Sequence, residues 1–152
     1  MKITDILSKK AIIADGKFGS KRQLLEKLAG MAEEETGADS RTLFDALLER
    51  ERLGTTGVGR GVALPHTRMT GLKKLYCAFI KTEPVGFDSV DGKPVDLVFL
   101  LLAPEESGAD HLKALAKLSR ILRDESIAAA LRDAKTPSQI YDIIVKYDEE
   151  DA

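Results

Sequence analysis

The sequence has no tryptophan, one cysteine and two histidines among its 152 residues. The single cysteine, Cys77, cannot form an internal disulfide bond, which is typical of proteins in the reducing cytoplasm. One cysteine and two histidines also argue against a structural zinc site, which usually needs four such ligands. We therefore expect a fold that depends on neither a disulfide bond nor a metal ion.

Long hydrophobic runs and a strong excess of charge are also missing. The longest apolar run, Leu97–Ala103, has seven residues, whereas a membrane helix needs roughly 20. The first residues lack the apolar segment and cleavage site of a signal peptide. The net charge is only −2, which argues against a strongly basic nucleic-acid-binding surface. We expect a cytoplasmic protein with no membrane insertion and no nucleic-acid partner.

Hydrophobic residues make up 43% of the chain and charged residues 32%, a balance that predicts a folded globular protein and not a disordered one. A chain of this length can bury one sizeable core. We predict a single domain over residues 1–152, with a frayed acidic tail at 148–152.

The hydrophobic patterns predict strands interspersed with helices. Expected strands cover residues 11–14, 62–64, 75–81 and 95–102, and expected helices cover 20–37, 39–54, 127–131 and segments that begin near 107–110 and at 136. Ser20 and Thr136 each precede a glutamine by three residues, as in a capping box. The intervals 62–75 and 80–95 contain no helical pattern, so part of the sheet is expected to be antiparallel. The predicted fold class is α/β, a single-domain sandwich with a mixed β-sheet flanked by helices.

A glycine-rich loop spans Gly54–Gly61 and resembles two nucleotide-binding motifs only superficially. The phosphate-binding P-loop fails because Arg60 and Gly61 replace its lysine and hydroxyl residue, and no helix follows. The dinucleotide-binding pattern fails because Val62 occupies the position of its third glycine. We therefore expect these glycines to permit positive φ angles in a tight connection, which also allows the loop to shape a site.

The two histidines are the strongest candidates for chemistry. His66 follows Pro65 at the end of the short strand 62–64, and His111 lies in the first turn of a helix whose inner side is predicted to carry Leu112, Leu115, Leu118 and Leu122. For either histidine alone, a structural role is the more common. Both lie at the ends of elements, however, where functional sites are usually built. Arg50 lies in the last turns of the helix before the glycine-rich loop, where a solvated surface role is the simplest alternative.

Two sequence blocks carry a resemblance to a known family. The first is Arg50–His66, which matches the pattern R-E-x-x-G-S-T-G-x-G-x-G-[V/I]-A-[V/I/L]-P-H except that Thr55 replaces serine and keeps the hydroxyl. The second comprises Pro94–Pro104 and His111–Ala116. On these blocks the sequence resembles the fructose/mannitol type of enzyme IIA of the phosphoenolpyruvate-dependent phosphotransferase system. Within that family it most resembles the nitrogen-regulatory subgroup.

The resemblance implies a phosphoryl carrier without a cofactor. In the family, the histidine that matches His66 accepts a phosphoryl group, on Nε2, from the histidine-containing phosphocarrier protein HPr or its nitrogen-branch counterpart. The residues that match His111 and Arg50 line the site. The hydroxyls of Thr55 and Thr56, and loop amides such as that of Gly57, are further candidate donors to the phosphate.

The sequence leaves the downstream partner open. The carrier is expected to act on regulatory target proteins or to pass its phosphoryl group to a IIB component of a sugar permease. A protein-binding module that never carries phosphate is the third alternative. A partner must reach His66, so we expect a shallow docking surface around it, with Leu72, Val85 and Phe87 as candidate apolar contacts.

Overall fold

In the computed structural model, which describes residues 1–151, the sheet is built around two long antiparallel strands, β5 (Tyr76–Val85) and β6 (Val95–Pro104). The central run of β6, Leu97–Ala103, is completely buried. This burial explains why the run is apolar at every position, since both faces of the strand are covered. The prediction of a central strand buried on both faces is confirmed.

Four shorter strands complete the six-stranded sheet: β1 (Ile12–Gly16), β2 (Gly57–Gly59), β3 (Val62–Ala63) and β4 (His66–Met69). β1 pairs parallel to β5, while β3 and β4 both pair parallel to β6. β2 pairs antiparallel to β3 and forms one edge. The predicted mixed sheet is thus confirmed, although β2 and β4 were not predicted as strands.

Pro65 separates β3 from β4. Its carbonyl accepts a hydrogen bond from the amide of Leu101 at 3.0 Å, but proline has no N–H with which to continue a ladder. His66 therefore begins β4, with Leu101 as its register partner on β6. The prediction that His66 ends the preceding strand is wrong, because the chain pairs with β6 again directly after the proline.

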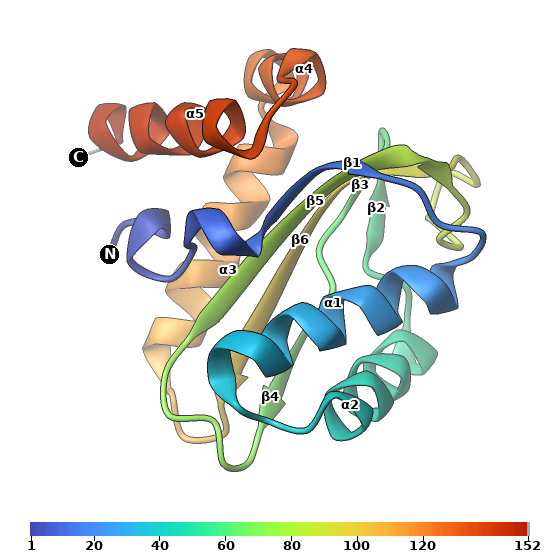
Figure 1. Cartoon of the computed structure of the whole chain (residues 1–152), viewed down its shortest axis with the longest axis vertical. Helices are drawn as coiled ribbons and strands as arrows, with labels where there is room; N and C mark the ends of the chain where they lie inside the picture. The colour runs from blue at the N-terminus through green and yellow to red at the C-terminus, as the bar shows by residue number, and fades with distance from the viewer. Residues whose placement is uncertain (152) are drawn as a thin grey trace.

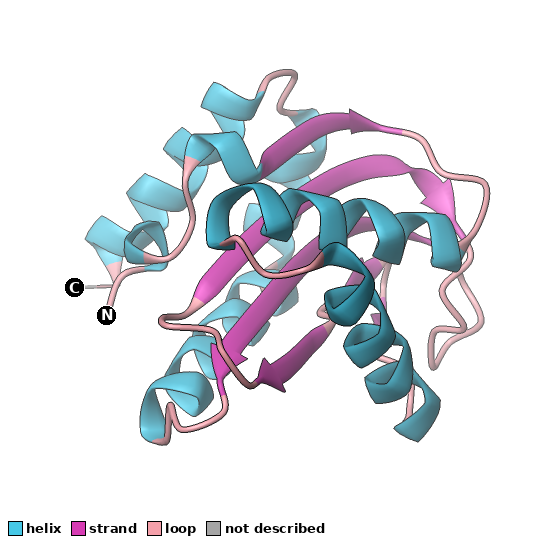
Figure 2. Ribbon diagram, turned by 60° about the horizontal axis from the view of Figure 1, so that its bottom comes forward, coloured by secondary structure: helices cyan, strands magenta, loops and turns pink. Residues whose placement is uncertain are grey.

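Helices cover the sheet on both sides (Figure 2). They are the α-helices α1 (Lys21–Thr36), α2 (Ser40–Leu53), α3 (Ala109–Arg123), α4 (Glu125–Asp133) and α5 (Pro137–Glu150), with two short 3-10 helices, η1 (Ile3–Asp5) and η2 (Lys9–Ala11). α1 and α2 pack against one another in front of the sheet, whereas α3 lies behind it (Figure 1). Over the described residues, no helix has the length and apolarity that a membrane crossing requires.

The predicted caps of α1 and α5 agree with the structure, whereas the helix predicted over 127–131 extends further at both ends, as α4. The hydroxyl of Ser20 accepts a hydrogen bond from the amide of Gln23 at 3.2 Å, and Thr136 does the same for Gln139 at 3.1 Å. Gly37 ends α1 in the left-handed region, with φ of 76°, where glycine carries little steric cost.

The acidic tail differs from its prediction. α5 continues to Glu150, and Asp148 is only 2% exposed. Its carboxylate accepts hydrogen bonds from the amides of Ile3 and Thr4, at 2.9 and 3.0 Å, and from the Thr4 hydroxyl. The prediction of a frayed tail is therefore wrong for Asp148, because this residue joins the two ends of the chain. Ala152 lies outside the described residues.

We expect Asp148→Ala to lower the free energy of unfolding by about 2–4 kcal/mol, because the buried amide of Ile3 and the partly buried amide of Thr4 lose a charged acceptor. Urea denaturation followed by circular dichroism measures this change. Glu149→Ala, at the exposed neighbouring position, is the matched control and should stay within about 0.5 kcal/mol of wild type. Equal stabilities for the two variants would contradict the assigned role of Asp148.

Candidate functional site

His66 is held by a hydrogen bond within its own short segment. Its Nδ1 lies 2.8 Å from the carbonyl oxygen of Leu64. A carbonyl only accepts hydrogen bonds, so Nδ1 carries the proton and Nε2 keeps its lone pair in the neutral ring. The side chain is half-buried. The backbone around Pro65 therefore presents Nε2 as the available nucleophilic nitrogen.

The surroundings of His66 keep its ring neutral. Burial lowers its pKa from the ordinary value, and the positive charge of Arg50 lowers it further. The hydrogen bond to Leu64 and the carboxylate of Glu51 oppose this shift without reversing it. The result is an imidazole that remains unprotonated at neutral pH.

His111 faces His66 from the first turn of α3. The two ring centroids are 6.3 Å apart, with the ring planes at 63°. His111 is 7% exposed and shares the buried side of α3 with Ala114 and Leu118, whereas Leu112 is 62% exposed. The prediction that Leu112 lies on the inner side is wrong, because the buried stripe begins at His111 and continues at spacings of three and four residues.

Sequence reasoning missed Arg68 as a component of the site. Its Nε donates a hydrogen bond to Nδ1 of His111 at 2.9 Å, and its Nη1 donates to the carbonyl of Glu105 at 3.4 Å. Burial lowers the pKa of His111, and the positive charge of Arg68 contributes to the shift. Nε2 of His111 is buried and has no hydrogen-bond partner. The sequence did contain a signal for Arg68. Side chains alternate between the two faces of an extended segment, so residues 66 and 68 lie on the same face.

Arg50 is anchored in the last turn of α2. Its Nη1 donates to the carbonyl of Gly54 at 2.9 Å, which satisfies one of the free carbonyls at the end of the helix. Its side chain is half-buried, and its charge acts on His66. The remaining N–H groups of the guanidinium are therefore fixed near the histidine by the helix end.

The three loop candidates use their polar groups to hold the loop itself. The Thr55 hydroxyl donates to the carbonyl of Phe87 and accepts from the amide of Gly57, both at 3.0 Å. The amide and hydroxyl of Thr56 both donate to the Glu51 carboxylate. A phosphate that used these hydroxyls, or the amides of Thr56 and Gly57, would have to displace the bonds that they already make.

Glu51, a second residue that sequence reasoning missed, organises the start of the loop. Its buried carboxylate also lies 3.0 Å from Nζ of Lys21, which supplies the compensating charge. Gly57 allows the loop to approach the opposite segment, since a Cβ there would lie 3.1 Å from Cα of Ser89. The predicted positive φ angles occur at Gly59 and Gly61, at 98° and 80°.

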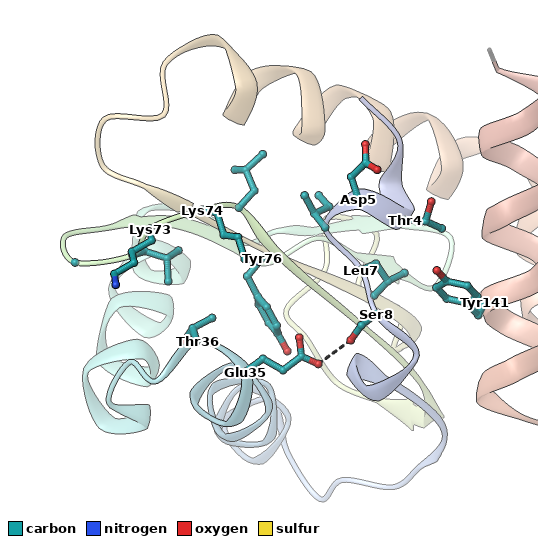
Figure 3. Close-up of a pocket in the computed structure, with 14 residues that line it drawn as sticks. Thr4, Asp5, Leu7, Ser8, Glu35, Thr36, Lys73, Lys74, Tyr76 and Tyr141 are labelled. Carbon is teal, nitrogen blue, oxygen red and sulfur yellow. Dashed lines mark hydrogen bonds between the residues drawn. The ribbon is translucent and has the colours of Figure 1, made fainter.

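A cavity of about 470 Å³ lies apart from these residues (Figure 3). It is bounded by the N-terminal segment 4–8, the end of α1 and the turn 71–76, and Glu35 accepts a hydrogen bond from Ser8 on its wall. His66, His111 and Arg50 do not line it. The candidate site is therefore separate from this cavity.

Exposed apolar side chains flank the candidate site. Leu53 lies one turn after Arg50 and is 81% exposed, and Leu112 follows His111 directly. Val85 and Phe87 are buried in the core, and Leu72 lines the separate cavity. The prediction that Leu72, Val85 and Phe87 together form an apolar surface around His66 is therefore wrong. The exposed apolar residues that neighbour the site residues in the chain are Leu53 and Leu112.

Comparisons with known proteins give one consistent result. The family model described as "Phosphoenolpyruvate-dependent sugar phosphotransferase system, EIIA 2" matches residues 5–147. A nitrogen regulatory protein of Bradyrhizobium diazoefficiens is 50% identical over 145 residues, which is 95% of each chain. The crystal structure of nitrogen regulatory protein IIA-Ntr from Neisseria meningitidis matches with a TM-score of 0.89 and 41% identity, over 93% of this chain and 98% of the other.

A more distant structure supports the fold alone. The mannitol IIA protein of Escherichia coli has a TM-score of 0.75 at 20% identity, over 90% of this chain and 97% of the other. The matched residues 5–147 include both sequence blocks on which the resemblance was based, and they extend from η1 into α5. The chain therefore belongs to the type 2 (fructose/mannitol) family of enzyme IIA components of the phosphoenolpyruvate-dependent phosphotransferase system.

Proposed function

We propose that the chain, as a single domain over residues 1–152, is a cytoplasmic phosphoryl carrier of the nitrogen-regulatory branch. It takes a phosphoryl group from an HPr-type phosphocarrier onto Nε2 of His66. One observation carries the proposal: the 2.8 Å hydrogen bond from Nδ1 to Leu64 leaves Nε2 as a neutral nucleophile. The name of the relative at 50% identity supports the regulatory branch.

The transfer is a displacement at phosphorus. The lone pair of His66 Nε2 attacks the phosphoryl group on the donor's histidine, so a new N–P bond forms while the donor's N–P bond breaks. The electron pair of the broken bond returns to the donor's ring nitrogen. During the transfer, Nδ1 of His66 keeps its proton, and this N–H continues to donate its hydrogen bond to the carbonyl oxygen of Leu64. The reaction requires only the two histidines and the groups that stabilise the phosphoryl oxygens.

Arg50 and His111 supply that stabilisation. The phosphoryl group brings nearly two negative charges, and a guanidinium meets such an oxyanion with strong, directional hydrogen bonds. Arg50 has N–H groups left after its bond to Gly54. His111 contributes through the ring that faces His66. Neither residue is the stable carrier of the group.

The exposed surroundings of the site fit exchange between proteins. A donor or acceptor protein must bring its own residue to His66, so the site must lie open, and aromatic or aliphatic contacts around it provide docking energy. Leu53 and Leu112, which are exposed and neighbour Arg50 and His111 in the chain, are the candidates for such contacts. Downstream, the same surface would serve regulatory target proteins, with a IIB component as the alternative acceptor.

His66→Ala is expected to abolish phosphorylation while the fold remains intact, because the ring is half-buried at the start of a short strand and not part of the core. Incubation with phosphoenolpyruvate and the upstream proteins, followed by mass spectrometry under non-acidic conditions, measures the added phosphate. His111→Ala is the matched control and should still be labelled on His66. Full labelling of the His66→Ala variant would reject the assignment.

Arg50→Lys is expected to slow transfer to His66 by roughly 10- to 150-fold, the factor that follows from losing one charge-assisted hydrogen bond of about 1.5–3 kcal/mol. Rapid-quench measurement of transfer from the phosphorylated donor tests this change. Arg52→Lys, two residues away and paired with Glu49, should transfer at the wild-type rate. If Arg50→Lys also keeps the wild-type rate, Arg50 only caps its helix.

The pKa of His66 is expected to lie below 6.5. Phosphoryl acceptance should therefore persist as pH falls toward that value, and should decline only where the ring gains a proton. NMR titration of the ring measures the pKa, and the His66→Ala spectrum identifies the remaining signals as those of His111. Arg50→Gln should raise the pKa of His66 because it removes a positive charge. A wild-type pKa at or above 6.5 would contradict this account of the site.

A further inference from the structure

Arg68 connects three elements behind the candidate site. It lies on β4 two residues after His66, so both side chains leave the same face of the strand. Its guanidinium reaches the carbonyl of Glu105, in the turn after β6, and Nδ1 of His111, in the first turn of α3. These two bonds fix the arginine between the strand and the helix.

The bond to His111 determines where that ring holds its proton. An arginine in a protein keeps its protons, so Nε–H of Arg68 can only donate. Nδ1 of His111, at 2.9 Å, must therefore be the acceptor and carry no proton. A neutral ring then has its hydrogen on Nε2. Protonation of Nδ1 would place two N–H groups against each other, so the imidazolium form would lose this hydrogen bond.

Within residues 1–151, the Nε2–H of His111 is a buried donor without an acceptor. Such groups are rare in folded proteins and call for an explanation. The ring faces His66 across 6.3 Å between centroids, and a phosphoryl group on His66 would bring three strong acceptor oxygens into that region. The two histidines thus hold opposite tautomers, with the proton on Nδ1 of His66 and on Nε2 of His111.

We propose that Arg68 is a positioning residue that fixes His111 as an Nε2–H donor to the phosphoryl group on His66. This inference rests on the proposed function, but its first step concerns the unphosphorylated protein alone. Arg68 acts through His111 and makes no phosphate contact of its own. It differs in this respect from Arg50, whose remaining N–H groups act on the phosphate directly.

The first test reads the ring nitrogens of His111 by long-range ¹H–¹⁵N NMR in the unphosphorylated protein. Wild type should show one state, with Nδ1 unprotonated and Nε2 protonated. In Arg68→Ala the Nδ1 signal should move toward the protonated position as pH is lowered, whereas Arg68→Lys, which keeps a charged donor, should partly restore the wild-type state. Arg41→Ala removes an exposed ion pair on α2 and should leave the ring signals of His111 unchanged. Unchanged His111 signals in Arg68→Ala would overturn the proposal.

The second test is a double-mutant cycle on the stability and onward transfer of the phosphohistidine. Arg68→Ala should shorten the lifetime of the group or slow its transfer by the same factor as His111→Ala, on the order of tenfold. The double variant should be no worse than His111→Ala alone, because Arg68 acts only through that ring. A further loss in the double variant would overturn the proposal by showing that Arg68 contacts the phosphate itself.

The two tests separate this inference from the proposed function. If wild type accepts no phosphate from the upstream proteins, the proposed function fails. The role of His111 as a hydrogen-bond donor to the phosphoryl group fails with it. The NMR spectra still decide whether Arg68 sets the state of His111. Arg68 is exposed and lies outside the core, so its single variants should keep the wild-type circular dichroism spectrum.

Discussion

The candidate site depends on one short hydrogen bond, from Nδ1 of His66 to the carbonyl of Leu64. This bond selects the nitrogen that can act as a nucleophile and holds the ring toward His111. It lies where Pro65 interrupts the hydrogen-bond ladder between β3 and β4, while the chain continues in one direction along β6. The buried strand β6 pairs with both short strands in one continuous register and thereby fixes the position of His66. The chemistry of a half-buried ring is thus set by the least accessible strand of the fold.

Arg50 and Arg68 are held near the site in the same way. Each is anchored by a backbone carbonyl, Arg50 by Gly54 and Arg68 by Glu105, and each acts on one histidine. An arginine that is already held loses less conformational freedom when an anion arrives. The same positive charges disfavour the imidazolium forms of the two histidines. In the proposed function, Arg50 also favours the phosphoryl dianion after transfer, whereas Arg68 acts through His111. One arrangement therefore serves both the acceptance of the group and its retention.

Features that depend on local or repeating sequence patterns could be predicted, while contacts between residues far apart in the chain could not. The caps at Ser20 and Thr136, the buried strand β6 and the mixed sheet follow from spacing and composition. The strands β2 and β4 are too short and too rich in glycine or polar residues to produce a strand pattern. The buried position of Asp148 depends on amides some 145 positions away. Arg68 was missed because its partner His111 lies on another element. The part that the Thr55 hydroxyl plays in holding the loop could not be predicted, because its acceptor, the carbonyl of Phe87, lies 32 residues away.

A carrier must hold a phosphoryl group without trapping it. Interactions that stabilise the phosphorylated ground state more than the transition state slow onward transfer. The donors around His66 meet this limit, because the Arg50 guanidinium is shared with a carbonyl and His111 is a neutral ring. The threonine hydroxyls and the loop amide, which would add further donors, are engaged in the loop's own hydrogen bonds. In the proposed function, the glycine-rich loop uses these groups to hold its own conformation, and a small set of donors around His66 suits a group that has to leave again.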